Sequence, residues 1–321
     1  MQAGLTQAEK GRTFRALHER DGAFVIPNPW DVGTARLLAH LGFEALATTS
    51  AGYAFSVGQR DNTISRDAMM EHVAAIASAT DLPVSGDLEN GFGDAPEVVA
   101  ETVQLAAEAG LAGCSIEDLS GRAGGTVYEF EYAVDRVRAG AEVARSLSFP
   151  FTLTARAENY LAGRPDLGDT IARLQAYQAA GANVLYAPGL TSKDDISALV
   201  QSVDRPVNVL AGLVGASLSV AELSAIGVKR ISVGSALSRA ALGEFLRAAL
   251  EMRGVGPGVA VRSVFDQLLL GLLEALRLAA AALTHGALLL AAALLEREMI
   301  FFFHADSSLV ENPAHGLYPE T

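Results

Sequence analysis

The sequence predicts an α/β protein built on a (β/α)8 barrel of the TIM type, with an N-terminal capping helix and an apolar helical C-terminal tail. Short apolar runs alternate with longer helical patterns through residues 22–250. Eight such runs occur with no long structureless loop between them, which is typical of a closed barrel. The alternative is a doubly wound open sheet, which needs a glycine-rich turn after its first strand. The turn here, PNPWDVG, has a single glycine, so the barrel is favoured.

The eight runs are predicted to be short parallel strands buried on both faces. Each is apolar and rich in β-forming residues, and most are bounded by Gly, Pro, Asn or Asp. In chain order they are residues 24–26, 45–49, 83–87, 113–117, 151–156, 183–187, 206–210 and 230–234.

Helical patterns fill the spaces between these strands. Asp94 precedes Ala-Pro-Glu, a sequence that predicts a helix N-cap, and Gly110 and Gly181 stand where helices should end. The segment 6–20 is predicted to be an additional amphipathic helix that closes the barrel bottom, with Thr6 as its N-cap. The others are predicted at residues 32–41, 66–80, 95–110, 129–147 and 169–180.

The C-terminal segment has a different composition, which divides the chain into a barrel domain, residues 1–255, and a tail, residues 256–321. Residues 266–303 are almost all Leu and Ala, and residues 278–295 carry no formal charge over the minimum length of a membrane-spanning helix. We interpret the tail as helices that pack on the barrel or on a second subunit. A membrane anchor and a disordered or non-native tail, such as one created by a shifted reading frame, are the alternatives.

Composition restricts the partners and the compartment. The chain has 321 residues and a formal net charge of −13, which argues against binding to nucleic acid or to anionic membranes. Its single cysteine, Cys114, cannot form an intrachain disulfide and fits a reducing compartment. The N-terminal residues have no apolar signal core. We therefore expect a cytoplasmic protein with a small-molecule substrate.

Carboxylates gather at the predicted C-terminal strand ends, where barrel enzymes carry their working residues. Asp87 and Glu89 follow the third strand, and Glu117 ends the fourth. Arg156 and Glu158 lie at the end of the fifth. Like charges on adjacent strand ends repel each other unless a cation joins them. Oxygen ligands favour Mg²⁺ or Mn²⁺ over zinc, so the sequence predicts a hard divalent cation bound at this rim.

Other reaction types are poorly supported. None of the six histidines lies at a strand end, which argues against a zinc site or a histidine base. Lys10 and Lys193 lie on helices and Lys229 precedes its strand, so no lysine is placed to form a Schiff base. Cys114 lies inside the fourth strand and is interpreted as a buried small apolar residue.

Two further segments have both a functional and a purely structural interpretation. The turn at residues 50–52, Ser-Ala-Gly, is either a tight loop or a set of N–H groups that hold a carboxylate or a developing enolate. Residues 87–94, DLENGFGD, form either a glycine-rich turn or a compact metal-facing loop, which we favour. Asp61 is either a helix-capping residue or a member of the site.

Four motifs together resemble the isocitrate lyase/phosphoenolpyruvate mutase superfamily, in order and spacing, over about residues 10–250. They are SAGYAFSVGQRD (50–61), SGDLENGFGD (85–94), GCSIED (113–118) and TARAENYL (154–161). The resemblance implies a TIM-like barrel that binds Mg²⁺ and assembles as a homodimer or homotetramer.

Carried over residue by residue, the resemblance assigns roles to the individual positions. Asp87 matches the acid bound most directly to Mg²⁺, and Glu89 and Glu117 match two further acids. Asp61 faces the reaction centre, and Arg156 binds the substrate anion. The remaining assignments, all to substrate binding, are the backbone amides of Ser50, Ala51 and Gly52, together with Glu158 and Asn208.

The sequence departs from the superfamily in one important loop. Isocitrate and methylisocitrate lyases carry a K-[KR]-C-G-H gating loop after the IED motif, whereas residues 119–130 here read LSGRAGGTVYEF. This departure argues against isocitrate lyase activity. From the predicted metal site and the resemblance, we predict a Mg²⁺-dependent lyase that cleaves or decarboxylates a small α-oxo or α-hydroxy (di)carboxylate through a pyruvate-type enolate, with Asp61 and Arg156 as catalytic residues. Phosphorus–carbon chemistry on phosphoenolpyruvate or phosphonopyruvate, and a non-catalytic carboxylate-binding barrel, are the alternatives.

Overall fold

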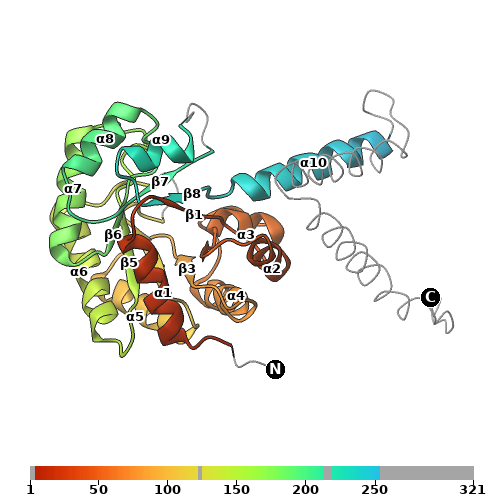
Figure 1. Cartoon of the computed structure of the whole chain (residues 1–321), viewed down its shortest axis with the longest axis horizontal. Coiled ribbons are helices and arrows are strands. Elements are labelled where there is room, and N and C mark those ends of the chain that lie inside the picture. Colours follow the sequence, from red (N-terminus) through yellow and green to blue (C-terminus); the bar gives the residue numbers. More distant parts are fainter. Residues whose placement is uncertain (1–3, 122–124, 213–217, 254–321) are drawn as a thin grey trace, which may run out of the picture. The chain divides into compact units, whose positions relative to one another are not determined.

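The computed structural model describes residues 4–121, 125–212 and 218–253, and in these the predicted barrel is present (Figure 1). Eight parallel strands form one sheet, in the order β1-β8-β7-β6-β5-β4-β3-β2. All eight predicted strands are confirmed, although β2 is shorter than expected. Their bounds are β1 Phe24–Ile26, β2 Leu46–Ala47, β3 Val84–Asp87, β4 Gly113–Glu117, β5 Thr152–Arg156, β6 Val184–Tyr186, β7 Val207–Leu210 and β8 Arg230–Ser232.

The ring of strands is nearly closed. The strands are paired in parallel register all the way from β1 through β8 to β2. At the remaining seam the N–H of Ala47 donates to the carbonyl of Pro27 at 3.1 Å. The side-chain amide of Asn28 strengthens the seam, because it donates to the carbonyl of Thr48 and accepts from the N–H of Val233. One asparagine therefore ties the ends of the first, second and eighth strands together.

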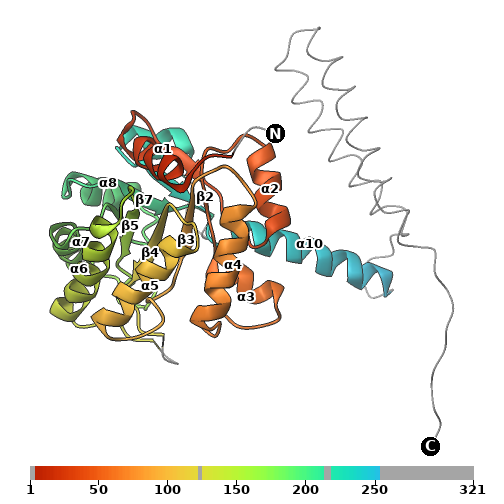
Figure 2. The same ribbon diagram turned by 90° about the horizontal axis from the view of Figure 1, so that it is seen from below.

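Helices surround the outside of the strands in both views (Figures 1 and 2). The helices in this surrounding layer are α2 Val32–His40, α3 Ser50–Ser56, α4 Arg66–Ser78, α5 Pro96–Glu108, α6 Phe130–Ser146, α7 Leu167–Ala180, α8 Lys193–Gln201 and α9 Val220–Ala225. Helix α1, Gln7–Glu19, precedes the first strand, and α10, Ala236–Met252, follows the last. The chain divides into two compact units between Gly243 and Glu244, so the barrel and the first turns of α10 form the first unit. Among the helices in the described ranges, none is long and apolar enough to cross a membrane. The predicted tail, residues 256–321, lies outside those ranges.

Helix α1 closes the barrel bottom as predicted. Thr6 is its N-cap, and a capping box joins Thr6 and Glu9. Phe14 is fully buried and packs edge-on against Phe24 of β1, with ring centroids 6.5 Å apart. Gly11 lets the helix come close to β5, because a Cβ there would lie 2.2 Å from the carbonyl oxygen of Pro150. Apolar side chains of α1 therefore cover part of the N-terminal ends of the strands.

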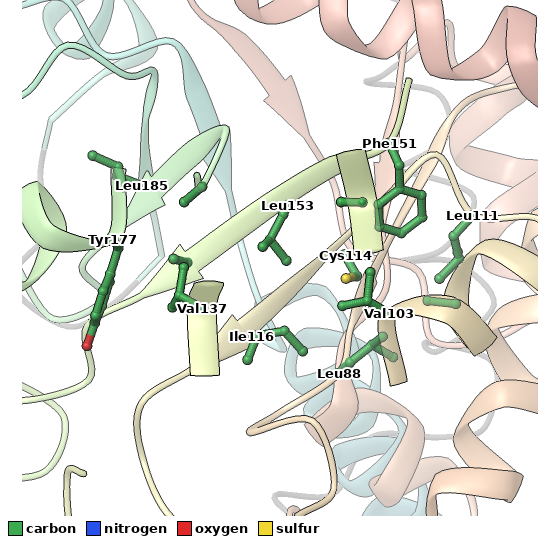
Figure 3. Packing of buried hydrophobic residues seen from close by; sticks show 14 of the residues in the cluster. Leu88, Val103, Leu111, Cys114, Ile116, Val137, Phe151, Leu153, Tyr177 and Leu185 are labelled. Atoms are coloured by element: carbon green, nitrogen blue, oxygen red, sulfur yellow. The ribbon is translucent and has the colours of Figure 1, made fainter. Parts of the chain in front are cut away.

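The main core lies between the strands and the outer helices. Figure 3 shows Cys114 on β4 and Leu153 on β5 beside Val103 of α5 and Val137 of α6. Cys114 is completely buried, and burial raises the pKa of its thiol. Gly140 of α6 allows close packing, since a Cβ there would already contact Val103 and Leu153. The interpretation of Cys114 as an apolar core residue is confirmed.

Two local predictions were wrong. Residues 50–52 do not form a loop but the first turn of α3, with the Thr49 hydroxyl accepting from the N–H of Gly52 at 3.2 Å. The N-cap of α5 is Ala95 rather than Asp94, and it makes no side-chain capping bond. Asp94 instead accepts a hydrogen bond from the Tyr128 hydroxyl at 2.6 Å. A tertiary partner thus replaced the local capping interaction that the sequence suggested.

Candidate active site

A cavity of about 240 Å³ lies at the C-terminal ends of the strands. It is smaller than the range of about 300–1,000 Å³ typical of pockets for drug-sized ligands, so it suits a small metabolite. Its polar lining comes from all parts of the ring. These residues include Asn28, Thr48, Ser50, Asp61, Asp87, Ser115, Glu117, Arg156, Glu158, Tyr186, Arg230 and Ser232.

Arg156 is the centre of the polar network in this cavity. It is the last residue of β5, and each nitrogen of its guanidinium contacts a different carboxylate. Nη1 lies 2.9 Å from Oδ1 of Asp87, Nη2 lies 3.1 Å from Oε2 of Glu117, and Nε lies 2.7 Å from Oε1 of Glu158. Its side chain is 14% exposed. The Arg156 Cζ atom also lies 5.1 Å from the ring centre of Tyr186. The three adjacent strand ends thus share one cation.

Asp87 is held from both sides of the cavity. Its Oδ2 accepts from the backbone N–H of Ser50 at 3.0 Å and from the Ser50 hydroxyl at 3.1 Å. Its own N–H donates to the Thr48 hydroxyl at 2.8 Å. Oδ1 accepts from Arg156 and, at 3.4 Å, from the hydroxyl of Ser115. The carboxylate therefore has a fixed orientation before any ligand binds.

The network holds more negative than positive charge. Burial raises the pKa of Glu117 well above its ordinary value, and it also raises the pKa of Glu158, although Arg156 opposes both shifts. The neighbouring carboxylates raise them further because like charges repel. Burial alone would lower the pKa of Arg156, but Glu158, Glu117 and Asp87 raise it. One arginine cannot balance these acids, so another cation would lower the free energy of the site.

Glu89 and Asp61 add to this excess from the edge of the cavity. The pKa of Glu89 is raised to about 8, chiefly by burial and also by the charges of Asp87 and Asp61. One oxygen of Glu89, Oε1, is buried without a hydrogen-bond partner, and the residue has a φ of 50°, in the left-handed region. It lines a neighbouring cavity that it shares with Asn62 and Arg66. Burial and the charge of Asp87 also raise the pKa of Asp61, which lines the main cavity at its exposed mouth.

The first turn of α3 offers one amide to the cavity. The N–H of Ser50 already donates to Asp87, and that of Gly52 donates to Thr49. The N–H of Ala51 has no acceptor among the described residues, and Ala51 lines the cavity. Of the three predicted amides, Ala51 is therefore the one available to an anion at this helix N-terminus. Gly52 does not line the cavity, and a Cβ there would lie 2.6 Å from Thr49.

Two residues predicted to contact the substrate have polar partners within the protein. Asn208 is buried behind the cavity, where it donates to Ser232 at 3.0 Å and accepts from Arg230 at 2.9 Å. Glu158 lines the cavity but is 2% exposed, with one carboxylate oxygen bonded to Arg156. Both residues hold the side chains that line the cavity in place.

Other lining residues were missed by the sequence analysis, namely Asn28, Tyr186, Arg230 and Ser232. Arg230 could have been identified from the sequence, because it is a charged residue at the start of an otherwise apolar predicted strand. Arg122, the one cation in the loop at residues 119–130, lies outside the described residues. Within that loop, Leu119 and Val127 form an antiparallel bridge.

The side chains partly fit the predicted divalent cation. Asp87 and Glu117 both line the cavity and offer oxygen ligands, which Mg²⁺ prefers. The raised pKa of buried Glu117 and the unpartnered oxygen of Glu89 indicate an unmet need for positive charge. Across residues 4–121, 125–212 and 218–253, however, no group of three His, Cys, Asp or Glu side chains is placed to hold one ion. A Mg²⁺ ion is commonly held by one or two carboxylates together with water and substrate oxygens, and this donor set matches that pattern.

The fold and the site together define a class of protein. A nearly closed (β/α)8 barrel that carries a carboxylate–arginine network at its C-terminal strand ends has the architecture of a barrel enzyme. The comparisons agree with this class. The phosphoenolpyruvate phosphomutase family model matches residues 14–253, and the chain belongs to this family within the isocitrate lyase/PEP mutase superfamily.

Three relatives illustrate the range of the family. A lyase or mutase candidate from Burkholderia cenocepacia J2315 has a crystal structure 61% identical to this chain, with a TM-score of 0.76 over 82% of this chain and 96% of that one. Oxaloacetate decarboxylase from Paraburkholderia xenovorans (strain LB400) is 30% identical over 70% of this chain and 75% of its own length. The structure of 2,3-dimethylmalate lyase is 27% identical, with a TM-score of 0.69 over 87% of this chain and all of that one.

Proposed function

We propose that the protein is a Mg²⁺-dependent lyase that cleaves or decarboxylates a small α-oxo or α-hydroxy dicarboxylate. The observation that carries the proposal is the set of Asp87, Glu117 and Arg156 on three adjacent strand ends around one small cavity. Two of the relatives support it, since one is an oxaloacetate decarboxylase and another a dimethylmalate lyase. Asp87 and Glu117 would hold the cation together with water and substrate oxygens, whereas Glu89, the third predicted ligand, lines the neighbouring cavity. When bound, it supplies positive charge for the substrate carboxylate and α-oxygen.

The residues of the chain supply orientation, charge and a proton. The carboxylate of the substrate lies near the N–H of Ala51, at the positive end of α3. Arg156 stabilises the negative charge that develops when the carbon–carbon bond breaks and its electron pair passes to a pyruvate-type enolate. Asp61, with its raised pKa at the cavity mouth, either donates the proton that completes the product or positions the substrate.

A screen for pyruvate release tests this function. Purified protein with MgCl₂ is incubated with oxaloacetate, alkylmalates and phosphonopyruvate, and pyruvate is detected by a coupled dehydrogenase. We expect turnover of at least one dicarboxylate, loss of that turnover in EDTA, and a fall of at least about a hundredfold in Asp87→Ala. Undiminished activity of Asp87→Ala would refute the metal assignment. A matched control is Asp135→Ala, an exposed acid paired with Arg138 on α6, which should retain full activity.

Phosphorus–carbon chemistry is the second candidate function. It is supported by the matching family model, which is that of phosphoenolpyruvate phosphomutase. ³¹P NMR of phosphoenolpyruvate and phosphonopyruvate incubated with the protein separates the two. Conversion of either compound supports the mutase or hydrolase function. Unchanged spectra, together with pyruvate release from a dicarboxylate, favour the lyase. A barrel that binds oxalate and Mg²⁺ but turns over none of these compounds would be a binding protein.

A further inference from the structure

Arg230 is a buried arginine without an anionic partner among the described residues. It begins β8 and is 3% exposed, and its one hydrogen bond runs from Nε to the side-chain oxygen of Asn208 at 2.9 Å. Its Nη1 is buried and has no hydrogen-bond partner. Arg173, another buried arginine, instead forms ion pairs with both Asp118 and Asp169. A buried guanidinium that lacks an anion is unfavourable, so the position of Arg230 requires an explanation.

Arg230 lies where a ligand can supply the missing anion. It lines the main cavity together with Ser232, two residues further along the same strand. Arg156 lines the same cavity, but each of its three nitrogens already contacts a carboxylate of the protein. Of the two guanidiniums in the cavity wall, Arg230 is therefore the one that has no carboxylate partner among the described residues.

The charge of Arg230 persists at neutral pH. The pKa of Arg230 is lowered to about 10, chiefly by burial and also by the like charge of Arg156, while Tyr186 opposes the shift. A group with this pKa is still protonated at pH 7. The cavity wall therefore presents a positive charge that Asn208 holds in place and that no described carboxylate contacts directly.

We infer that Arg230 binds the second carboxylate of a dicarboxylate substrate. The inference rests on the proposed function, in which the first carboxylate and its α-oxygen lie toward Asp87, Ala51 and the cation. Arg230 then receives the carboxylate at the other end of the molecule. Arg230 thereby gives the site a preference for dicarboxylates over monocarboxylates. It determines specificity and takes no part in breaking the carbon–carbon bond.

Calorimetry with two matched ligands tests this role without requiring turnover. Malate and lactate share the α-hydroxy carboxylate group and differ in the second carboxylate. In the presence of MgCl₂, the unmodified protein should bind malate at least tenfold more tightly than lactate. Arg230→Met should weaken malate binding about thirtyfold or more and change lactate binding less than about threefold, because only malate contacts this residue.

A second variant supplies the anion from within the protein. Asn208→Asp keeps the size of the side chain and places a carboxylate at the atom that already contacts Nε of Arg230. The ligand-free variant should melt at a higher temperature than the unmodified protein, because the buried charge gains a partner. It should also lose the preference for malate, because its own carboxylate occupies the guanidinium.

The outcomes separate this inference from the proposed function. Loss of the malate preference in Arg230→Met, with lactate binding retained, supports the role of Arg230 whether or not a substrate has been found. A malate preference that survives in Arg230→Met overturns it, as does the absence of any preference in the unmodified protein. A lower melting temperature in Asn208→Asp would also overturn it, since no anion would then be missing at this position. Failure of the pyruvate screen bears on the proposed function alone.

Discussion

Replacement of Arg156 by Met should destabilise the protein strongly, and more at alkaline than at acidic pH. Three carboxylates lie 2.7–3.1 Å from its guanidinium, and each of their side chains is less than one-fifth exposed. Removing one partner of a buried ion pair costs about 3–5 kcal/mol. We therefore expect Arg156→Met to lose about 3–5 kcal/mol of the free energy of unfolding at pH 8, a large fraction of the total for a domain.

The pH dependence of this loss follows from the direction of the pKa shifts. Burial raises the pKa of Glu117 and of Glu158 even with Arg156 present, and without it both should rise further. A carboxyl whose pKa rises on folding keeps its contribution to stability below its unfolded value of about 4.3 and loses it as the pH rises toward the folded value. The deficit of Arg156→Met should therefore shrink between pH 8 and pH 5.

Urea unfolding at the two pH values, without added metal, measures this effect. Arg20→Met is a suitable control, because the Arg20–Glu44 ion pair is just as short, 2.6 Å, but its side chains are 41% and 52% exposed. That variant should lose less than about 1 kcal/mol. The reasoning is refuted if Arg156→Met stays within about 1 kcal/mol of the unmodified protein at pH 8, or if its deficit is the same at pH 5.

Three further predictions concern single titratable groups. Glu89→Gln should stabilise the metal-free protein by a few kcal/mol at pH 8 and by little at pH 5, because the pKa of Glu89 is raised to about 8; equal melting temperatures at pH 8 would contradict this. Burial lowers the pKa of His18 to about 3, so the contribution of His18 to stability is present above pH 6.5 and declines as the pH falls. When the pH is lowered from 7 to 5, the free energy of unfolding measured in urea should therefore fall by about 2 kcal/mol less in His18→Leu than in the unmodified protein. Cys114 should resist a thiol reagent at pH 8 until urea unfolds the chain, and rapid labelling of the native protein would disprove its burial.

Periodicity and turn residues were sufficient to predict the barrel. The eight strands are short, largely buried and bounded by turn residues, so pattern and topology agree in the structure. The helix at residues 50–56 was missed because it is short and its capping residue, Thr49, lies inside the segment read as a strand. Asp94 was misassigned because Tyr128 is distant in sequence, and no local pattern reports such a partner.

The candidate site was predictable in outline, since strand ends bring Asp87, Glu117 and Arg156 together. Which of the predicted residues face the cavity and which pack behind it could not be predicted. Whether Asn208 faces the cavity or the packing behind it depends on the side chains of the neighbouring strand, which the spacing of one strand cannot show. The acidic residue at position 89 was correctly placed near the rim, but its left-handed backbone, which directs it to a neighbouring cavity, was not foreseen.

Diffraction from crystals grown with Mn²⁺ and oxalate, a mimic of the pyruvate enolate, tests the account most directly. The account predicts an anomalous peak inside the cavity, with an oxygen of Asp87 at about 2.0–2.2 Å from the ion and oxalate bound to it. Crystals with oxalate in the cavity but no anomalous peak beside Asp87, or with peaks confined to surface acids, would contradict the account.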